Sequence, residues 1–498
     1  MSKNPLDPLN PREFDELKAR HLLQRAGFGG TEKQVTALAN LGLENAVNYI
    51  VDYEKLNDNL PVRGDEFDPD IMRPRTRSEQ DNFRDARRSG DEAMLEQLRL
   101  DRQRRQRADR QQIEQMERWW LKRFVETAKP LQEKMVLFWH GHFATGYRAI
   151  ENSYHMFLQN NLFRDYALGN FKEDLVRKII RDPAMIKYLN NDQNRKGSPN
   201  ENLARELMEL FTLGEGEGYT EDDIKEGAKT LTGYNVEDDS FAFRSNLHDT
   251  STKSIFGRRG NYDGDDFIDL IFTRKQAKIF IVEKLYKFFV NDLPNGKTED
   301  ATAYINQLGN LLKRKDWAVK PIVKTIFMSS HFYSEENMQA IIKSPIQLIA
   351  QAIRSLNTPQ RNKLVSSLVI ASDLMGQRLF APPSVKGWDG GRAWINTSTM
   401  FIRQNTLLYL ITGQRPDGYG WDADSSAFDV MPLINSIENE PKKIAAHLMN
   451  TLLGTKQPNQ DRLSSLLDYL KTQNNEINNT TVMGLLTLIT AMPEYQLC

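Results

Sequence analysis

The sequence contains only one cysteine, Cys498, among 498 residues. A single cysteine excludes an internal disulfide framework and a cluster of thiolate metal ligands. Long apolar runs are also absent, because the richest stretch, residues 279–290, is interrupted by Glu283, Lys284 and Lys287. That stretch falls short of the roughly 18 apolar residues that a membrane-spanning helix needs. We therefore expect neither a disulfide nor a transmembrane segment.

An excess of charge of one sign is missing as well. The 66 Lys and Arg residues nearly balance the 67 Asp and Glu residues, so no global field attracts nucleic acid or an anionic membrane. The first fifteen residues contain three prolines and no apolar stretch, and therefore no recognisable secretion signal. These features predict a cytoplasmic protein that does not bind nucleic acid.

Several common enzyme motifs are absent too. We find no Gly-x-Ser-x-Gly elbow, no phosphate-binding loop and no dinucleotide fingerprint on a strand–helix turn. Helical periodicity dominates, and no series of alternating strands is evident. The sequence predicts an all-α, multi-helix bundle-like globular protein with irregular loops and at most a short hairpin near residues 235–260.

Residues 84–118 form a charge-dense segment, with ten basic and eight acidic residues and few large apolar ones. Its clustered arginines would suit a basic arm for nucleic acid. The near-balance of signs and the lack of interleaved aromatic residues instead favour a solvated helix with i,i+4 ion pairs. We therefore predict a charged helical arm or insertion here.

We expect the rest of the protein to be arranged around residues 198–214. Ser198 is typical of a helix N-cap, Glu201 of a capping box, and Gly214 of a left-handed C-terminal residue. The helical spacing predicts one buried face, made of Leu203, Leu207, Leu210 and Phe211. Glu206 lies at the edge of that face, where a carboxylate is costly to desolvate unless it has a partner. Glu206 is therefore a candidate functional residue.

His140 and His142 are the first candidate metal ligands. Residues at i and i+2 lie about 200° apart on a helix, so the two could share a metal only if the helix breaks at Gly141. His142 shares an apolar helical stripe with Phe138, while His140 points to the opposite side. The alternative is one hydrogen-bonded core histidine and one surface histidine.

Irregular segments supply further candidates. His248 and Asp249 are adjacent on a predicted loop and could act as ligand and orienter, or as base and acid. A turn in which Asp249 bonds its own backbone explains them equally well. Lys253 could neutralise an anionic substrate or pair with Asp249. Trp388, in a glycine-rich loop, could stack on a ring or pack against the core.

Taken together, several stretches resemble a large bacterial family known as domain of unknown function 1800. The resemblance rests on residues 21–29, 138–143, 167–171, 182–185, 194–197, 200–214, 231–234, 247–249, 387–388 and 493–496, with Lys253, Trp394 and Arg403. It runs from about residue 18 almost to the end of the chain. It implies that residues 1–498 are one family-wide helical unit.

The resemblance implies no established activity. Many relatives look exported and are often encoded beside a second uncharacterised exported family, which suggests a co-encoded protein partner. This chain departs from that pattern because it has no recognisable signal, so beside the cytoplasmic expectation the resemblance leaves a periplasmic or secreted location as the alternative. It also has Phe211 where some relatives carry a histidine, so a ligand at that position would be missing here.

Our first hypothesis is a metal-dependent hydrolase with a site between helices. His142, Glu206 and His248 would hold one divalent metal, Zn, Fe or Mn, with Asp249 orienting His248 and His140 as an alternative ligand. Such a metal lowers the pKa of bound water to make a nucleophile. Glu206, Asp249 and His140 are then the expected catalytic residues.

The expected substrate-binding residues are Asn202, Lys253, Trp388 and Arg403. A second hypothesis is a non-catalytic helical scaffold or assembly partner, in which Glu206 pairs with an arginine such as Arg403. A third is a metal-free glycan-acting enzyme that uses Glu206 and Asp249 as its acid/base pair. Trp388 or Trp394 would then provide the platform for the sugar.

Overall fold

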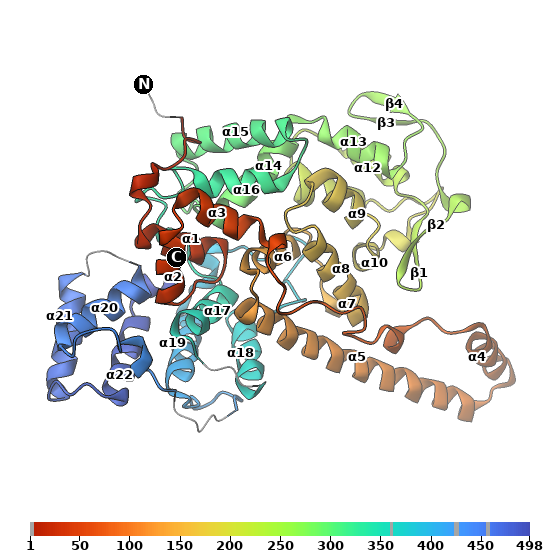
Figure 1. The fold of residues 1–498 in the computed structure, drawn as a ribbon. Coiled ribbons are helices and arrows are strands. Elements are labelled where there is room, and N and C mark those ends of the chain that lie inside the picture. Colours follow the sequence, from red (N-terminus) through yellow and green to blue (C-terminus); the bar gives the residue numbers. More distant parts are fainter. Residues whose placement is uncertain (1–3, 359–361, 423–427, 455–458) are drawn as a thin grey trace.

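The computed structural model describes residues 4–358, 362–422, 428–454 and 459–498. Within these ranges nearly all regular structure is helical, and four short strands form two separate antiparallel hairpins (Figure 1). The predicted all-α, mostly helical fold class is thus confirmed. In the described part of the chain, no helix is both long and apolar enough to cross a membrane.

The N-terminal helices pack onto later parts of the chain. They are α1 (Glu16–Ala26), α2 (Glu32–Asn40) and α3 (Leu43–Val51). Thr31 begins α2 with a complete capping box, in which its side chain and that of Gln34 each bond the other residue's backbone N–H. α1 contacts α2, and α3 packs against α16 (Val319–Met328).

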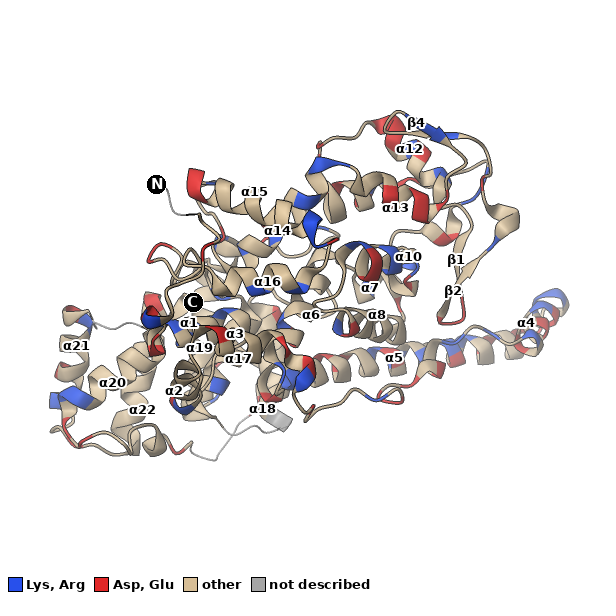
Figure 2. Ribbon diagram, turned by 45° about the horizontal axis from the view of Figure 1, so that its top comes forward, with Lys and Arg blue, Asp and Glu red and all other residues tan. Residues whose placement is uncertain are grey.

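A helical arm projects from the rest of the molecule (Figure 1). It consists of α4 (Arg77–Ser89) and the first half of α5 (Glu92–Glu126), whose buried residues begin only at Asp109. Figure 2 shows both signs of charge mixed along this arm. Local ion pairs such as Arg99–Glu96 join neighbouring turns of the helix. The segment predicted as a charged arm, residues 84–118, thus spans the end of α4 and most of α5.

A buried ion cluster joins α5 to the next two long helices, α6 (Pro130–His142) and α8 (Ser153–Asp165). The fully buried Glu133 carboxylate accepts hydrogen bonds from Arg123 at 2.7 Å, from Arg164 at 2.8 and 3.0 Å, and from the Trp120 indole at 3.0 Å. Burial alone would raise the pKa of Glu133, but the two guanidinium groups lower it to about 2. The cluster therefore holds an ionised carboxylate in the core.

Short and irregular helices make up the middle of the chain. They are α7 (Tyr147–Ile150), the π-helix η4 (Phe171–Val176), α9 (Arg177–Ile179), α10 (Pro183–Tyr188), α11 (Asn202–Glu206), a second π-helix η6 (Leu207–Thr212) and α12 (Glu221–Thr230). Such π-helical turns are rare and are often found at functional sites.

Two hairpins follow α12, although the sequence predicts at most one. They pair β1 (Tyr234–Glu237) with β2 (Ser240–Phe243), and β3 (Lys253–Ile255) with β4 (Arg258–Gly260). The turns adopt positive φ at Asp238 (52°), and at Phe256 (49°) and Gly257 (75°). Neither turn has the Asn-Gly or Asp-Gly pair that is typical of a tight hairpin, so the sequence predicts these hairpins only weakly.

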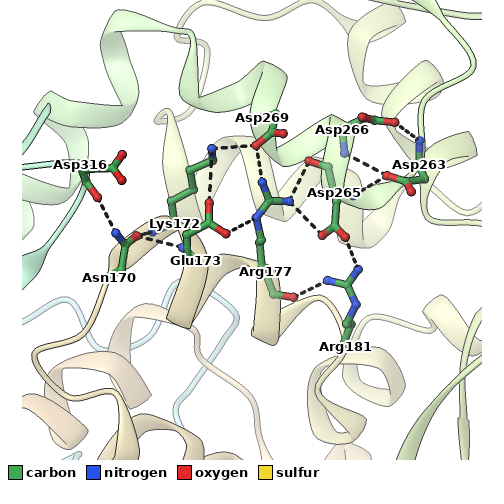
Figure 3. Close-up of polar contacts among 10 residues, drawn as sticks. All are labelled: Asn170, Lys172, Glu173, Arg177, Arg181, Asp263, Asp265, Asp266, Asp269 and Asp316. Atoms are coloured by element: carbon green, nitrogen blue, oxygen red, sulfur yellow. Dashed lines mark hydrogen bonds and ion pairs between the residues drawn. The ribbon is translucent and has the colours of Figure 1, made fainter.

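An ion-pair network fastens η4 and α9 to α13 (Gly264–Phe272), as Figure 3 shows. The Asp265 carboxylate lies 3.0 Å from Arg177 and 2.8 Å from Arg181, and Lys172 pairs with Asp269 at 2.7 Å. The two carboxylates are about half exposed, so each pair contributes little by itself. The network holds the orientation of α13 through several shared contacts.

The remaining helices complete one continuous hydrophobic core. They are α14 (Lys275–Phe289), α15 (Glu299–Arg314), α17 (Pro345–Leu356), α18 (Asn362–Leu374), α19 (Thr397–Thr412), α20 (Pro441–Leu453), α21 (Gln460–Thr472) and α22 (Asn479–Thr490). Buried apolar side chains form a single cluster that extends from Leu9 to Tyr495. This core places α6, α14 and the segment before α17 around one pocket.

Candidate functional site

The central motif begins its helix later than the sequence predicts. α11 starts at Asn202, and its N-cap residue Glu201 makes no side-chain capping bond, so the predicted caps at Ser198 and Glu201 are wrong. The Ser198 N–H donates instead to the Arg195 carbonyl at 3.0 Å, which closes a turn before the helix. Gly214 does adopt positive φ, at 106°, as expected for the residue after a helix.

The motif then changes its helical period. In η6 the N–H of Leu213 donates to the carbonyl of Met208, five residues earlier, at 2.9 Å. The wider turn rotates the following residues, so Met208 is buried and Leu210 is only half-buried. Leu210, predicted on the buried face, is thus only partly buried but still packs against the core, whereas Phe211 is fully buried as expected.

The π-helix supplies the partner of His142. The Nε2–H of His142 donates to the Phe211 carbonyl at 3.0 Å. Because a carbonyl only accepts hydrogen bonds, Nδ1 carries the lone pair, and this buried atom has no hydrogen-bond partner among the described residues. Burial and the nearby charge of Lys284 hold the pKa of His142 well below its ordinary value, so the ring is neutral.

Glu206 lies at the junction of α11 and η6 and is half-buried. Burial, together with the neighbouring Glu209 carboxylate, raises its pKa. No hydrogen bond or ion pair joins the Glu206 carboxylate to another described residue. Asn202, the other predicted residue of this motif, is exposed, and its N–H donates to the Asn200 side chain at 3.0 Å.

His140 is buried in the core. Its Nε2 accepts a hydrogen bond from the Phe380 N–H at 3.2 Å, and its ring packs 5.3 Å from Trp120 and 5.6 Å from Trp388. Burial lowers its pKa to about 3. His140 is thus one of two buried histidines on α6, and the alternative of one core and one surface histidine is wrong.

His248, Asp249 and Lys253 form a closed turn after the 3-10 turn at Ser245–Leu247. The ring Nδ1–H of His248 donates to the Thr232 carbonyl at 2.8 Å. The Asp249 carboxylate accepts from the backbone N–H of Ser251 at 2.8 Å, and the buried Lys253 amine donates to the Asp249 carbonyl at 2.7 Å. These contacts explain the segment as local structure.

The three predicted metal ligands do not come together. Across the described ranges, no group of three or more His, Cys, Asp and Glu side chains is placed so that it could hold a metal ion. His142, Glu206 and His248 therefore do not form a ligand set in this structure. One ring nitrogen of each histidine donates to a backbone carbonyl, of Phe211 and of Thr232, and the other nitrogen keeps its lone pair, so their positions and not these hydrogen bonds keep them from forming a ligand set.

Arg403 is fully buried on α19. Its Nε donates to the Gln496 side chain at 2.9 Å, and its Nη2 donates to the Lys343 carbonyl. Arg403 therefore ties α19 to the last residues of the chain. The predicted Glu206–Arg403 pair is not among its contacts with the described residues.

Trp388 and His142 are the two predicted site residues that line a shared pocket of about 620 Å³. Its walls come from α6, α14, residues 341–347 and the 386–394 loop, with Arg25 of α1. This volume lies within the usual range for pockets that bind small molecules. Trp394, also in this loop, lines the pocket as well.

The pocket walls are strongly basic. Five lysines line it, namely Lys134, Lys284, Lys287, Lys343 and Lys386, together with Arg25 and Arg392. The acidic side chains among its lining residues are Asp292 and Asp389. Arg25 is fully buried and donates to the carbonyls of Phe289 and Val290 at 3.0 Å each.

Burial changes the acidity of the innermost amines. The pKa of Lys134 is lowered to about 8 and that of Lys343 to about 7, in both cases mainly by burial. Burial and the like charge of Lys287 lower the pKa of Lys284 to about 8. Such shifts are typical of functional sites, because cations accumulate there at a cost in desolvation.

Polar atoms of the pocket residues also lack partners. The Trp388 Nε1–H, the Arg25 Nε–H, the His142 Nδ1 and one Asp292 oxygen are buried, and none makes a hydrogen bond to the described residues. Buried polar groups are nearly always hydrogen-bonded, so four such atoms on the residues of one pocket are notable. Two of them are donors and two are acceptors, which suits a ligand with both kinds of group.

Sequence reasoning missed most of this pocket. The interruption of the apolar 279–290 run by Lys284 and Lys287 is the signal that could have found it, because a lysine among core residues needs a reason. More than a hundred residues separate Lys134 from Arg25 on one side and from α14 and Lys343 on the other, so only the fold brings these side chains together.

The chain belongs to the family described as "Protein of unknown function (DUF1800)", which matches residues 21–497. This is nearly the whole chain, in agreement with the resemblance of its motifs. No curated protein and no solved structure matches the chain.

Proposed function

We propose that the protein binds a small organic anion in the basic pocket. The observation that carries the proposal is the convergence of five lysines and two arginines on one cavity, whose described lining residues supply opposite charge only at Asp292, Asp389 and Cys498.

Lys287 and Lys386 are exposed and pair with Glu283 and Glu215. The buried Arg25, Lys134 and Lys343 instead donate hydrogen bonds to neutral acceptors. Buried cations cost free energy unless an opposite charge compensates them. A carboxylate or phosphate group on a ligand would provide that compensation.

The rest of the wall suits a planar or apolar body. Phe138, Phe288 and Trp388 contribute aromatic side chains to the pocket. Aromatic rings stack on flat ligands, and a Trp N–H without a partner can donate to a ligand acceptor. We therefore favour an anion that carries a ring or a short apolar chain over a bare inorganic ion.

Isothermal titration calorimetry with pyridoxine 5′-phosphate, an anionic ring compound, tests the proposal. We expect saturable binding to the wild-type protein and at least about tenfold weaker binding to Lys284→Gln, because one cation is lost. Lys275→Gln, an exposed position on the same helix, is the matched control and should leave the affinity unchanged. Absence of binding at millimolar probe, or equal loss in both variants, would overturn the proposal.

The metal-dependent hydrolase, the scaffold and the glycan-acting enzyme stay predictions. Among the described residues, nothing in the geometry of His142, Glu206 and His248 favours the first of these over anion binding.

A further inference from the structure

The five lysines of the pocket differ in what their amines contact. Four of them have protein acceptors, in the pairs Lys134–Gln347, Lys287–Glu283, Lys343–Tyr495 and Lys386–Glu215. Lys284 is the exception, since no hydrogen bond or ion pair joins its amine to another described residue. The amine lies 5.0 Å from the centre of the Phe280 ring instead.

Lys284 therefore has an amine that is available to a ligand. Its side chain is only partly buried and forms part of the pocket wall. With a pKa of about 8, roughly a tenth of this amine is neutral at pH 7, whereas an ordinary lysine is almost entirely protonated. Lysines become nucleophiles in proteins when they are desolvated or placed beside another cation, and both conditions hold here.

We propose that Lys284 forms an imine with the carbonyl carbon of an anionic aldehyde or ketone bound in the pocket. This inference rests on the proposed anion binding, and it narrows the ligand class to anions that carry a reactive carbonyl group. The anionic group would be held by the other cations of the pocket, with the protonated form of Lys284 adding attraction and its neutral form attacking the carbonyl.

The reaction balances without a further reagent. The neutral amine attacks the carbonyl carbon and forms a carbinolamine, in which one nitrogen proton passes to the former carbonyl oxygen. Loss of water, which takes that oxygen and both amine protons, then leaves the carbon–nitrogen double bond. No oxidant or reductant is consumed, and hydrolysis reverses the reaction.

Lys134 and Lys343 line the same pocket and can be compared with Lys284 as nucleophiles. Their pKa values are lowered to about 8 and about 7, so acidity alone would make them equal or better nucleophiles. Both side chains are buried, however, and their amines donate to Gln347 and to the Tyr495 carbonyl. Attack by either amine would require the loss of that hydrogen bond.

Reductive trapping on the full chain tests the inference. The protein is incubated with pyridoxal 5′-phosphate, an anionic aldehyde, the imine is reduced with borohydride, and the modified lysines are located by peptide mass spectrometry. We expect Lys284 to be labelled at pH 7 at least about tenfold faster than exposed lysines, because more of its amine is neutral. Pyridoxine 5′-phosphate, which lacks the aldehyde, should protect it.

Labelling spread over the lysines without preference for Lys284 would overturn the inference, as would preferential labelling of Lys134 or Lys343. The labelling pattern is measured on the wild-type protein, so the test does not depend on whether a variant folds. Calorimetric binding of pyridoxine 5′-phosphate then separates two failures. If that compound binds, only the imine is wrong; if it does not bind, the proposed anion binding fails as well.

Discussion

Gly387 lies directly against the carbonyl oxygen of Gly141, at the end of α6. A Cβ atom added at residue 387 would lie 2.1 Å from that oxygen, and Gly387 also has positive φ, at 79°. Only glycine permits this approach between two backbone segments. The contact places the next residue, Trp388, over Gly141 and His140 and so forms one wall of the pocket.

Gly387→Ala should therefore disturb the pocket more than the rest of the protein. We expect at least a tenfold loss of affinity for pyridoxine 5′-phosphate, because the 386–394 loop must move away from α6. Calorimetry measures the affinity, and circular dichroism checks that the helices remain. Gly257→Ala, which has the positive φ of 75° and open space around its Cβ and is not among the pocket lining residues, is the matched control. An equal effect of both changes would show that the Gly141 contact is not what matters.

Glu133 is the carboxylate whose loss should destabilise the fold most. Glu133→Gln leaves two buried arginines without their counter-ion, which typically costs about 3–5 kcal/mol of unfolding free energy. Glu114→Gln, at an exposed position on α5, should change stability by less than about 0.5 kcal/mol. Urea denaturation of the three proteins provides the comparison, and similar midpoints would contradict the role of the cluster.

The same carboxylate predicts a pH dependence of stability. The pKa of Glu133 falls from an ordinary 4.5 to about 2 in the folded protein, so its ionised form stabilises the native state above pH 4.5. That contribution should disappear as the pH falls from 4.5 towards 2. Glu133→Gln should accordingly flatten the decline in unfolding free energy over this range, and an unchanged slope would contradict the assignment.

The pH dependence of ligand binding should be governed by the pocket lysines. Lys343 loses its proton near pH 7, and Lys134 and Lys284 near pH 8. Anion affinity should therefore fall about tenfold between pH 7 and pH 9, as cationic partners are neutralised. Trapping of pyridoxal 5′-phosphate by Lys284 should accelerate over the same interval, since imine formation needs the neutral amine. If the anion affinity and the rate of trapping by Lys284 changed in the same direction with pH, the result would contradict the proposed roles of the lysines in anion binding and imine formation.

Metal content separates anion binding from the metal-dependent hydrolase predicted from the sequence. The hydrolase hypothesis expects about one equivalent of Zn, Fe or Mn, lost in Glu206→Ala. For anion binding we expect no stoichiometric metal and unchanged affinity of Glu206→Ala for pyridoxine 5′-phosphate, because Glu206 is not among the described residues that line the pocket. Elemental analysis of both proteins decides between them.

The helical fold could be predicted because apolar periodicity is local, as for the buried Leu203 and Leu207. The details that failed depend on tertiary contacts. The π-helical turn at residues 207–212 breaks the 3.6-residue period and moves Leu210 outwards. The same π-helical turn contains Phe211, whose carbonyl accepts the hydrogen bond from His142, and no sequence pattern indicates this contact.

The candidate site was predictable only in part for the same reason. Trp388 and His142 belong to motifs that stand out in the sequence, and both line the pocket. Lys134 and Lys343 each look like ordinary lysines in their own segments. Their burial follows from the packing of α6 beside residues 341–347, a long-range contact that periodicity does not encode.

A crystal structure with pyridoxine 5′-phosphate, at a concentration above its measured dissociation constant, tests the central claim most directly. We predict that the compound lies in the pocket between α6, α14 and the 386–394 loop. Its phosphate should lie within hydrogen-bonding distance of at least two of the pocket cations, and its ring should lie near Trp388. Density for the compound only outside this pocket, or a pocket without it under saturating conditions, would contradict the proposal.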